Sequence, residues 1–509
     1  RRTAARLEPG ERTAGRVNTQ ISRLAVAGLV LVTSLIVGTT YWQAWAAPSL
    51  AERQDNAIKV VAQFTIKRGL IYAGDGVTRL AVNRRRRVAG QTFYLRRYPK
   101  GELTAHPVGY STRSRSRTGL ERSRNDYLTG ANRNLSTVLD TTLDELRGKT
   151  IEGNDILTTI RWRAQAVALR ALGGQCGAAV ALEPSTGKVL VLASSPSFDP
   201  NLVERNFAAV QRGRGPCPIA PLLNRGTAGL FIPGSTFKVV TAAAALDTGR
   251  YSPESSFVDP GYCIEYGQRV NNYDTSSPFG RVSFSQALVN SINSSFCEMG
   301  KELGPSVILD YARRFGFYED PPVDLPADER LPSGLYKNGK LVPESEEGRA
   351  DPGRLAFGQE RLLVTPMQMA MVAAAVANGG VVMKPYVTDR VRAPDGSIVQ
   401  RMKPDELRRA IKEETARELT AMMEGVVTGG TGTAAQIAGV RVAGKTGTAE
   451  TGTAGRNVAG FISFAPADRP RVAVAVYLQN QSGTGGSVAA PVAKQIMQAL
   501  LRTPSNSES

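Results

Sequence analysis

The alternation of apolar and polar positions divides the chain into three stretches. A charge-free apolar run extends from Leu24 to Ala51, and it exceeds the roughly 20 residues that a helix needs to cross a bilayer. Residues 52 to about 150 are polar and Arg-rich, with short strand-like pieces such as Thr92–Arg96. From Gly153 onward, apolar residues recur with the periods of helices and strands. We therefore expect a membrane-spanning helix, an extended loop-rich pedestal and a folded domain.

Residues 153–501 carry the pattern of an α/β domain. The segment ILTTIRWRAQAVALRAL predicts a helix over residues 156–172, and AAVALE and KVLVLASS predict a hairpin around a Pro-Ser-Thr-Gly turn. RVAVAVYL (471–478) is typical of a buried strand, and residues 490–501 have the spacing of an amphipathic helix. The Ala- and Met-rich middle, about 240–425, is expected to be mostly helical. Strands from both ends of the region should build one sheet.

The distribution of charge gives the membrane helix a direction. The net charge is +18, arginines precede the apolar run, and Tyr41, Trp42 and Trp45 lie at its far end. Basic residues mark the cytoplasmic side of a membrane helix, and aromatic residues mark the interface. We expect an uncleaved single-pass anchor in the cell membrane, with a cytoplasmic N-terminus and an extracellular remainder. The alternative is a signal peptide cleaved near Ala44-Trp45-Ala46, a small-x-small sequence.

Five consecutive segments follow from these features. They are a basic cytoplasmic tail (1–23), a transmembrane anchor (24–47), an extracellular pedestal (48–152), a folded domain (153–501) and a disordered tail (502–509). Within the pedestal, the run Arg84–Arg87 indicates either a solvated basic face or contact with anionic polymers of the wall. Its position outside the cell argues against nucleic acid as a partner.

Four cysteines accompany a single histidine, His106. The cysteines (Cys176, Cys217, Cys263 and Cys297) lack C-x-x-C spacing, so we expect no zinc site. Outside the membrane an even number of cysteines favours disulfides, and four cysteines allow three connectivities. Cys263–Cys297 is the pairing that we expect, although the sequence leaves the connectivity open.

Residues 439–448, GVRVAGKTGT, match two incompatible motifs. As G-x-x-x-x-G-K-[ST] they would form a phosphate-binding loop, with Lys445 reaching a nucleotide. As K-T-G-T they would belong to a serine acyl-transfer site. A phosphate loop needs a glycine-rich turn ahead of a helix, whereas VRVA alternates like a strand and the Thr- and Gly-rich segment after Lys445 is a poor helix former. We therefore reject the nucleotide interpretation.

The segment PGSTFK, residues 233–238, supports acyl transfer. The helix-forming run VVTAAAAL follows it and stops near Gly249. Ser235 and Lys238 should thus share one face at the start of a helix, where the helix dipole favours developing negative charge. The position of the one histidine in the pedestal disfavours a Ser-His-Asp triad. A lysine whose pKa is lowered by burial and by a second cation, such as Lys445, is the candidate base.

A third polar element, Ser291-Ile292-Asn293, lies within the helical sequence QALVNSINSSFCEMG. By itself it predicts only a helix cap. However, it falls about 55 residues after S-x-x-K and about 150 before K-T-G. S-x-x-K, S-x-N and K-T-G in this order resemble the motifs of penicillin-binding proteins and serine β-lactamases.

The resemblance extends beyond the motifs. GAAVALEPSTGKVLVLASSPSFDPN, NRGTAGLFIPGSTFK, FGQERLLVTPMQMAMVAAAVANGG and VAGKTGTAE are similar to class B penicillin-binding proteins, across nearly all of residues 153–501. RGLIYAGDG (residues 68–76) resembles the N-terminal module of that family. The resemblance implies a β-lactamase-like α/β transpeptidase domain with a central antiparallel sheet and an all-helical subdomain. It also implies a D,D-transpeptidase that needs no cofactor or metal, with D,D-carboxypeptidase side activity.

Roles for single residues follow from the same resemblance. Ser235 would be the nucleophile that forms the acyl-enzyme, and Lys238 the base that activates it. Ser291 and Asn293 would relay protons and hold the donor peptide, and Lys445 would add positive potential.

The K-T-G-T strand would bind the substrate. Thr446 and Thr448 would bind its carboxylate on either side of Gly447, and the N–H groups of Ser235 and Thr448 would form the oxyanion hole. One position departs from the family pattern, because Gly460 stands near the place of a usual aromatic residue. Either Phe461 substitutes for that residue, or the acceptor side of the cleft is wider.

The resemblance also implies partners. They are peptidoglycan stem peptides, the lipid-linked precursor, β-lactam antibiotics, the membrane, and a membrane glycosyltransferase of the shape-and-division family. The sequence leaves open whether the role lies in division or in elongation. Two alternatives are a catalytically silent scaffold of a cell-wall synthase, favoured by the large basic pedestal, and a β-lactamase-like hydrolase. The hydrolase would need a water-activating carboxylate that the sequence does not reveal.

Overall fold

The computed structural model describes residues 9–41, 64–113, 116–131, 152–211, 217, 220–274, 277–451 and 455–502. The chain divides into two compact units, Arg1–Phe64 and Thr65–Ser509. Several sequence predictions lie outside the described residues. They concern the first residues of the basic tail, Trp42 and Trp45, the cleavage site near Ala44–Ala46, and residues 503–509 of the disordered tail.

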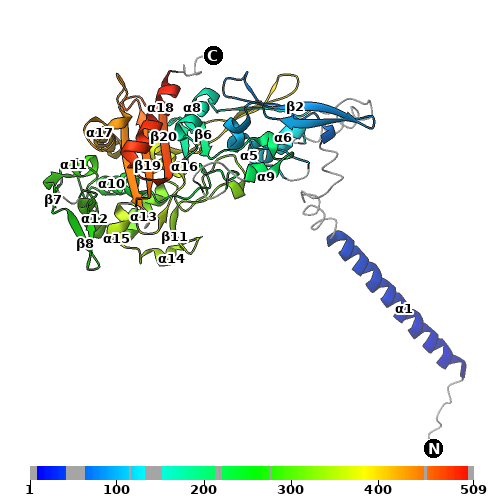
Figure 1. The fold of residues 1–509 in the computed structure, drawn as a ribbon. Coiled ribbons are helices and arrows are strands. Elements are labelled where there is room, and N and C mark those ends of the chain that lie inside the picture. Colours follow the sequence, from blue (N-terminus) through cyan, green and yellow to red (C-terminus); the bar gives the residue numbers. More distant parts are fainter. Residues whose placement is uncertain are drawn as a thin grey trace, which may run out of the picture. The chain divides into compact units, whose positions relative to one another are not determined.

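The first unit contains the helix α1 (Pro9–Thr40; Figure 1). Its segment Ile21–Thr40 is the one helix among the described residues that is long and apolar enough to cross a membrane. Two hydroxyl groups within it, those of Thr33 and Thr39, donate to carbonyls one turn earlier, which satisfies them without water. The helix is described as far as Thr40, and residues 42–47 of the predicted anchor lie outside the described residues.

The second unit contains two large sheets, of six and five strands, and several small ones. Strands from the predicted pedestal belong to the six-stranded sheet. This mixed six-stranded sheet has the order β16-β15-β4-β1-β2-β3. Its strands are β1 (Ile71–Tyr72), β2 (Arg79–Val88), β3 (Gln91–Arg97), β4 (Asp155–Thr158), β15 (Thr388–Arg392) and β16 (Ile398–Arg401). β1 and β4 are parallel, and the other neighbours are antiparallel. The sheet thus crosses the predicted boundary at residue 153, and the pedestal contains longer strands than we expected.

Strand pairing makes two segments more extended than the sequence predicted. Residues 156–158 were expected to be helical, but they belong to β4, and the helix α8 begins only at Trp162 and ends at Leu172. Pairing of β4 with β1 on one side and β15 on the other overrides the local helical pattern. Likewise, the strand-like piece Thr92–Arg96 is part of a long β2–β3 ribbon that extends from one end of the unit (Figure 1).

A buried group of charges ties the pedestal together. Glu121, in α5 (Gly119–Ser123), accepts hydrogen bonds from Arg68 at 2.9 Å and from Arg96 at 2.6 Å. All three side chains are almost fully buried. Burial alone would raise the pKa of Glu121, but Arg96 and Arg68 lower it below its usual value. The carboxylate therefore stays charged in the core and joins β3, α5 and the segment before β1.

The second sheet is antiparallel, with five strands in the order β18-β19-β20-β5-β6. Its strands are β5 (Gly177–Leu182), β6 (Val189–Ser195), β18 (Ala443–Glu450), β19 (Asn457–Ala465) and β20 (Val472–Gln481). The helices α8 and α18 (Ala490–Leu501) contact each other and the sheet, and α16 (Pro366–Ala377) packs against it as well (Figure 1). The predicted hairpin, last strand and last helix are confirmed, as is a sheet built from both ends of the domain.

The part of the chain between β6 and β18 was expected to be mostly helical, but its helices alternate with loops and many short strands. Besides α16, its helices include α10 (Lys238–Asp247), α11 (Phe284–Val289), α12 (Asn293–Leu303), α13 (Pro305–Arg314), α15 (Pro352–Ala356) and α17 (Glu413–Thr428). The region also has short strands, namely β7 (Ser256–Asp259), β8 (Tyr262–Glu265), β9 (Gln268–Asn271), β10 (Gly280–Ser283), β11 (Gly334–Lys337), β12 (Lys340–Leu341), β13 (Leu362–Leu363), β14 (Val381–Met383) and β17 (Glu406–Arg409). Small hairpins thus accompany the expected helical subdomain.

Short helices complete the second unit. They are α4 (Ala105–Val108), α6 (Asn125–Thr129), α9 (Phe207–Gln211) and α14 (Glu344–Glu347). All four cysteines form disulfides, Cys176–Cys217 and Cys263–Cys297. The expected pairing of Cys263 with Cys297 is confirmed.

Candidate active site

The S-x-x-K element forms the tight turn before α10. Gly234–Phe237 is a single 3₁₀ turn, and Lys238 is the first residue of the α-helix. Gly234 has φ +51°, and a Cβ there would lie 3.0 Å from the carbonyl oxygen of Thr448. Only glycine suits this close approach in a left-handed conformation. Ser235 is partly exposed, whereas Lys238 is completely buried.

The amine of Lys238 points toward the S-x-N element. Its Nζ donates to the carbonyl oxygen of Ser291 at 2.7 Å and to Oδ1 of Asn293 at 2.8 Å. Burial, and then the nearby Lys445, lower the pKa of Lys238 well below its usual value, as the sequence predicted. Within the part of the chain that the structure describes, the hydroxyl of Ser235 has no hydrogen-bond partner. It is free to meet a substrate, and such contacts often tighten only when substrate binds.

Ser291 links the two lysines. It follows α11 with φ +58°, a left-handed conformation that is uncommon for serine and that often marks functional sites. Its hydroxyl accepts a hydrogen bond from Lys445 at 2.9 Å and lies 3.4 Å from Nζ of Lys238. One hydroxyl therefore connects both amines.

The K-T-G-T residues lie on β18, which is the terminal strand of the central sheet. Lys445 is fully buried, and burial lowers its pKa to about 7. Gly447 packs on the turn of the nucleophile, because a Cβ there would lie 2.6 Å from the carbonyl oxygen of Pro233. The hydroxyl of Thr446 shares a 2.6 Å hydrogen bond with Thr431, and that of Thr448 accepts from the N–H of Gly485 at 3.1 Å.

A second layer of contacts holds Asn293 at the start of α12. Its Nδ2 donates to the carbonyl oxygen of Asn271 at 3.0 Å. The next residue, Ser294, donates its hydroxyl to Asp259 at 2.5 Å and its N–H to Asn272 at 3.0 Å. Asn272 in turn donates to both oxygens of Asp259. The β8–β9 hairpin and its neighbours are thereby attached to the helix that presents Asn293.

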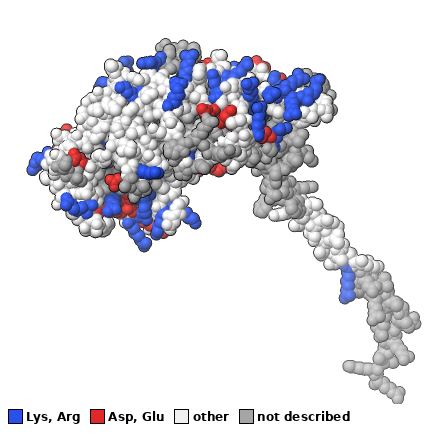
Figure 2. Space-filling model, in the orientation of Figure 1, with Lys and Arg blue, Asp and Glu red and all other residues white. Residues whose placement is uncertain are grey.

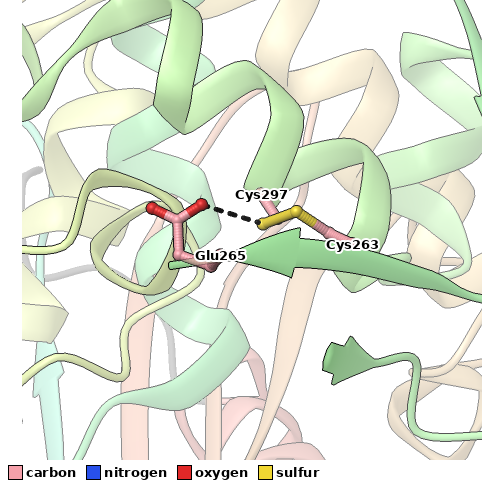
Figure 3. Close-up of side chains that lie close together, drawn as sticks. All are labelled: Cys263, Glu265 and Cys297. Carbon is pink, nitrogen blue, oxygen red and sulfur yellow. Dashed lines mark hydrogen bonds between the residues drawn. A yellow bond between two sulfur atoms is a disulfide. The ribbon is translucent and has the colours of Figure 1, made fainter. Parts of the chain in front are cut away.

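The Cys263–Cys297 disulfide reinforces this attachment (Figure 3). Cys297 lies one turn after Asn293 on α12, and Cys263 lies on β8. The carboxyl group of Glu265 points at Cys297 (Figure 3). Cys263, Glu265 and Cys297 have potential ligand atoms within 4.8 Å of one another. Since the two sulfur atoms are joined to each other, they are not thiolates that could bind a metal.

Sequence reasoning missed several of these residues. Asp259, Asn272 and Thr431 belong to no motif, and they reach the site only through tertiary contacts. Tyr477 was included in a predicted buried strand, but its hydroxyl was not considered. A tyrosine in the otherwise aliphatic RVAVAVYL is a signal, because a buried hydroxyl needs a partner.

Phe461 does not take the place of the aromatic residue that the family pattern has near Gly460. Phe461 is fully buried among residues of α18 and the neighbouring strands. Gly460 belongs to the other face of the sheet, since successive residues of a strand alternate. His106 is likewise remote from the motifs; its Nε2 lies 2.9 Å from the carbonyl oxygen of Pro221, and burial lowers its pKa to about 4.

Two known domain families match the second unit. The model of the penicillin-binding protein transpeptidase domain matches residues 177–498. The model of the penicillin-binding protein A dimerisation domain matches residues 68–156. Together the two matches account for most of the second unit.

Individual proteins match over nearly their whole length. The chain is 34% identical over 507 residues to the peptidoglycan D,D-transpeptidase PbpA of Mycolicibacterium smegmatis, covering 96% of this chain and 99% of the relative. The ceftriaxone acyl-enzyme of penicillin-binding protein A from M. tuberculosis has a TM-score of 0.77 at 33% identity, over 87% of this chain and 100% of that one. Its penicillin G acyl-enzyme has a TM-score of 0.74 at 34% identity, over 86% and 100%.

Proposed function

The chain belongs to the penicillin-binding protein transpeptidase family, and from this premise we propose that it is a peptidoglycan D,D-transpeptidase acting through an acyl-enzyme on Ser235. It binds stem peptides and is acylated by β-lactams. The single observation that carries the assignment of residues is the convergence of Lys238 and Lys445 on Ser291, next to the turn of Ser235. A solvated serine would lack a base, whereas here a desolvated amine lies one helical turn away.

In the first half-reaction the stem peptide is transferred to Ser235, and its terminal D-Ala is released. Neutral Lys238 accepts the hydroxyl proton while Oγ of Ser235 bonds to the carbonyl carbon of the penultimate D-Ala. The electron pair of the carbonyl moves to its oxygen, which accepts hydrogen bonds from the N–H groups of Ser235 and Thr448. Removing one such donor costs roughly 2.7–4 kcal/mol in other enzymes. Collapse breaks the C–N bond, and the proton passes through Lys238 and Ser291 to the departing amine of D-Ala.

In the second half-reaction an amine of a neighbouring stem attacks the ester. Lys238 accepts the proton of that amine and returns a proton to Oγ of Ser235, so that a new amide replaces the ester and the enzyme is restored. Attack by water instead would give the carboxypeptidase side reaction. In both half-reactions Lys238 first accepts a proton from the attacking group and then returns one to the leaving group. The same acid–base residues therefore serve acylation and cross-linking.

The free edge of β18 suits an extended donor peptide. Among the strands that the structure describes, β18 pairs with β19 alone, and a peptide can add to an unpaired strand edge through main-chain hydrogen bonds. Lys445, Thr446 and Thr448 would bind the terminal carboxylate, and Gly447 keeps the strand close to Ser235. Asn293 would hold the amide of the donor peptide.

Labelling with a fluorescent penicillin tests this proposal. We expect a covalent band in the wild-type protein and none in Ser235→Ala. Ser397→Ala, which alters an exposed serine outside the site, is the matched control and should label normally. No band in folded wild-type protein would overturn the enzymatic assignment and favour the silent scaffold. A band that disappears within minutes would favour the β-lactamase-like hydrolase.

The protein is membrane-anchored through α1, and we propose that its N-terminus is cytoplasmic and its second unit extracellular. Two arguments support this orientation: the proposed substrate, peptidoglycan, lies outside the membrane, and basic residues precede the apolar helix. We also propose the segments 1–23, 24–47, 48–152, 153–501 and 502–509 as its functional divisions. Protease added to intact cells should digest the second unit. Protection of that unit would contradict its proposed extracellular location.

A membrane glycosyltransferase of the shape-and-division family is the proposed partner. The lipid-linked precursor must be polymerised before its stems are cross-linked, and the anchor would keep both steps at the membrane. Co-purification from membranes after mild cross-linking should recover such an enzyme. Recovery of the transpeptidase alone, under conditions in which other membrane complexes survive, would contradict this partnership.

A further inference from the structure

Three residues that pair across the central sheet differ greatly in size. Gly447 on β18 pairs with Gly460 on β19, and Gly460 pairs with Tyr477 on β20. Residues paired in this way project from the same face of a sheet. The face is that of the nucleophile turn, because a Cβ on Gly447 would lie 2.8 Å from Cγ2 of Thr236. Two adjacent positions on this face are therefore bare backbone, and the third carries a large ring.

The ring of Tyr477 lies over Gly460. A Cβ on Gly460 would lie 2.8 Å from Cε1 and 3.3 Å from Cζ of Tyr477, so any larger residue would displace the ring. Tyr477 is fully buried, and its ring centroid is 5.6 Å from that of Phe231. The absence of a side chain at Gly460 thus makes room for an aromatic residue from the neighbouring strand.

The hydroxyl of Tyr477 reaches the residue next to the nucleophile. It lies 2.6 Å from Oγ1 of Thr236, and Thr236 donates to the carbonyl oxygen of Pro233 at 2.8 Å. Because Thr236 uses its only hydroxyl proton for Pro233, Tyr477 must be the donor of the first bond. Burial raises the pKa of Tyr477 above its usual value, so the phenol keeps this proton. The order of donation is Tyr477 to Thr236 to Pro233.

This chain of hydrogen bonds spans the turn that carries Ser235. Pro233 and Thr236 flank Ser235 on its two sides, and the N–H of Gly234 is held by the carbonyl oxygen of Gly358 at 3.1 Å. Gly234–Phe237 is only one 3₁₀ turn long, and such a short element makes few hydrogen bonds of its own. Contacts with neighbouring elements therefore do much to fix its conformation. A shift of the turn would move both Oγ and the N–H of Ser235, and misplacement of about 1 Å is costly for reactivity.

We propose that Tyr477 is a positioning residue that acts through Thr236 to hold the Ser235 turn in its reactive conformation, and that Gly460 is required to admit its ring. This inference rests on the proposed acyl transfer by Ser235. It also gives the departure noted at Gly460 a structural reason, since a glycine there leaves room for the ring of Tyr477 from β20. The position contributes to the nucleophile and not to recognition of the acceptor.

The acylation kinetics of Tyr477→Phe test the proposal. This variant keeps the ring and removes one hydrogen bond, so the first-order acylation step with benzylpenicillin should slow by about three- to tenfold. Noncovalent binding before acylation should change little, because Tyr477 is fully buried. Tyr311→Phe is the matched control; Tyr311 is also buried and donates to Asp247 at 2.8 Å, at the far end of α10. It should lose stability without losing acylation rate.

Two further variants separate positioning from general destabilisation. Thr236→Val should slow acylation to a similar extent, and the double variant with Tyr477→Phe should be little slower than either single variant. Thr236→Ser, which keeps the hydroxyl, should recover most of the rate lost in Thr236→Val. Gly460→Ala should displace the ring and slow acylation although the Tyr477 hydroxyl is intact.

The outcomes distinguish this inference from the proposed function. If wild-type protein is acylated and Tyr477→Phe reacts at the same rate, the positioning role is wrong and the transpeptidase assignment stands. Additive effects of Thr236→Val and Tyr477→Phe would show that Tyr477 does not act through Thr236. If wild-type protein itself is not acylated at Ser235, the proposed function fails first.

Discussion

Lys445 donates a hydrogen bond to the hydroxyl of Ser291 over 2.9 Å, although the two residues are 154 positions apart in the chain. The same hydroxyl lies 3.4 Å from the amine of Lys238. Both amines are fully buried, and a positive charge on Lys445 disfavours a positive charge on Lys238. If only Lys445 carries a positive charge, the amine of Lys238 is neutral. A base that accepts the proton of Ser235 must be neutral in this way.

The lowered pKa values predict a bell-shaped dependence of acylation on pH. The rate should rise as Lys238 loses its proton, because only the free amine accepts the proton of Ser235. It should fall again above about 7, where Lys445 becomes neutral and no longer attracts the carboxylate of penicillin. The measurement is the rate constant of benzylpenicillin acylation from about pH 5 to about pH 9.

Substitution of Lys445 provides the control for this profile. Lys445→Gln should react slowly at every pH and should lack the alkaline limb. Its acid limb should move to higher pH, because the charge of Lys445 no longer lowers the pKa of Lys238. A wild-type rate that still rises at the alkaline end of this pH range, toward the ordinary lysine pKa of 10.5, would show that neither amine is desolvated as described.

Removal of the Cys263–Cys297 disulfide should weaken both stability and acylation. A disulfide that closes a loop of this length contributes about 3–4 kcal/mol to the free energy of unfolding. Without it, the β8–β9 hairpin would hold Asn293 only through hydrogen bonds such as that from Asn293 to Asn271. We expect the Cys263→Ala/Cys297→Ala variant to acylate about three- to tenfold more slowly.

The second disulfide is a matched control for the first. Cys176–Cys217 closes a loop of similar length, with a sequence separation of 41 against 34, and neither cysteine contacts the motifs. Cys176→Ala/Cys217→Ala should lose a comparable part of the unfolding free energy and keep its acylation rate. Equal loss of acylation in both variants would mean that the rate follows overall stability and not the position of Asn293.

Loss of the buried carboxylate at Glu121 should destabilise the N-terminal part of the second unit. Glu121→Ala leaves Arg68 and Arg96 buried without a counter-ion, and breaking such a group costs about 3–5 kcal/mol. Chemical denaturation, followed by far-UV circular dichroism, measures this cost. Substitution of the exposed pair partner Glu152, which lies 2.8 Å from Lys67, should change the free energy of unfolding by less than about 1 kcal/mol.

The same carboxylate predicts the sign of an acid effect. The pKa of Glu121 is lowered in the folded chain from 4.5, so its contribution is complete above about 4.5 and is lost as pH falls through the folded value. Wild-type protein should therefore lose stability in acid more steeply than Glu121→Gln. Parallel acid curves for the two proteins would contradict a charged Glu121 in the core.

The arginine run on the β2–β3 ribbon should support contact with anionic wall polymers. Arg84–Arg87 are all exposed, and none forms an ion pair with another described residue. Figure 2 shows Lys and Arg side chains gathered over this end of the second unit. Replacing all four arginines with glutamine should reduce co-sedimentation of the second unit with cell-wall fragments at low salt. Added salt should weaken binding of the wild type toward that of the variant.

An equal loss of charge elsewhere is the control for this effect. Arg205, Arg250, Arg281 and Arg361 are exposed but scattered over other elements. Their replacement by glutamine changes the net charge by the same amount without touching the ribbon. If both sets of substitutions weaken sedimentation equally, the attraction comes from net charge and the ribbon has no special role.

The sequence alone determined the features that depend on neighbouring residues. Apolar periodicity predicted the membrane helix, the β5–β6 hairpin, β20 and α18, because hydrophobic patterns reflect which face of an element is buried. The order of S-x-x-K, S-x-N and K-T-G indicated the chemistry, because each motif keeps its reactive groups within a few residues. The burial of the catalytic lysine was predictable too. No histidine accompanies the motifs, so the base had to be a lysine whose pKa is lowered by desolvation.

Only the tertiary structure decided how those local pieces meet. Ile156 lies in a strand and not in the predicted helix, because pairing with β1 and β15 supplies hydrogen bonds that the isolated segment cannot make. The left-handed backbone of Ser291, the network around Asp259 and the contact of Tyr477 with Thr236 likewise join residues that are distant in sequence. Their geometry depends on packing between elements, and a pattern read along one chain does not contain it.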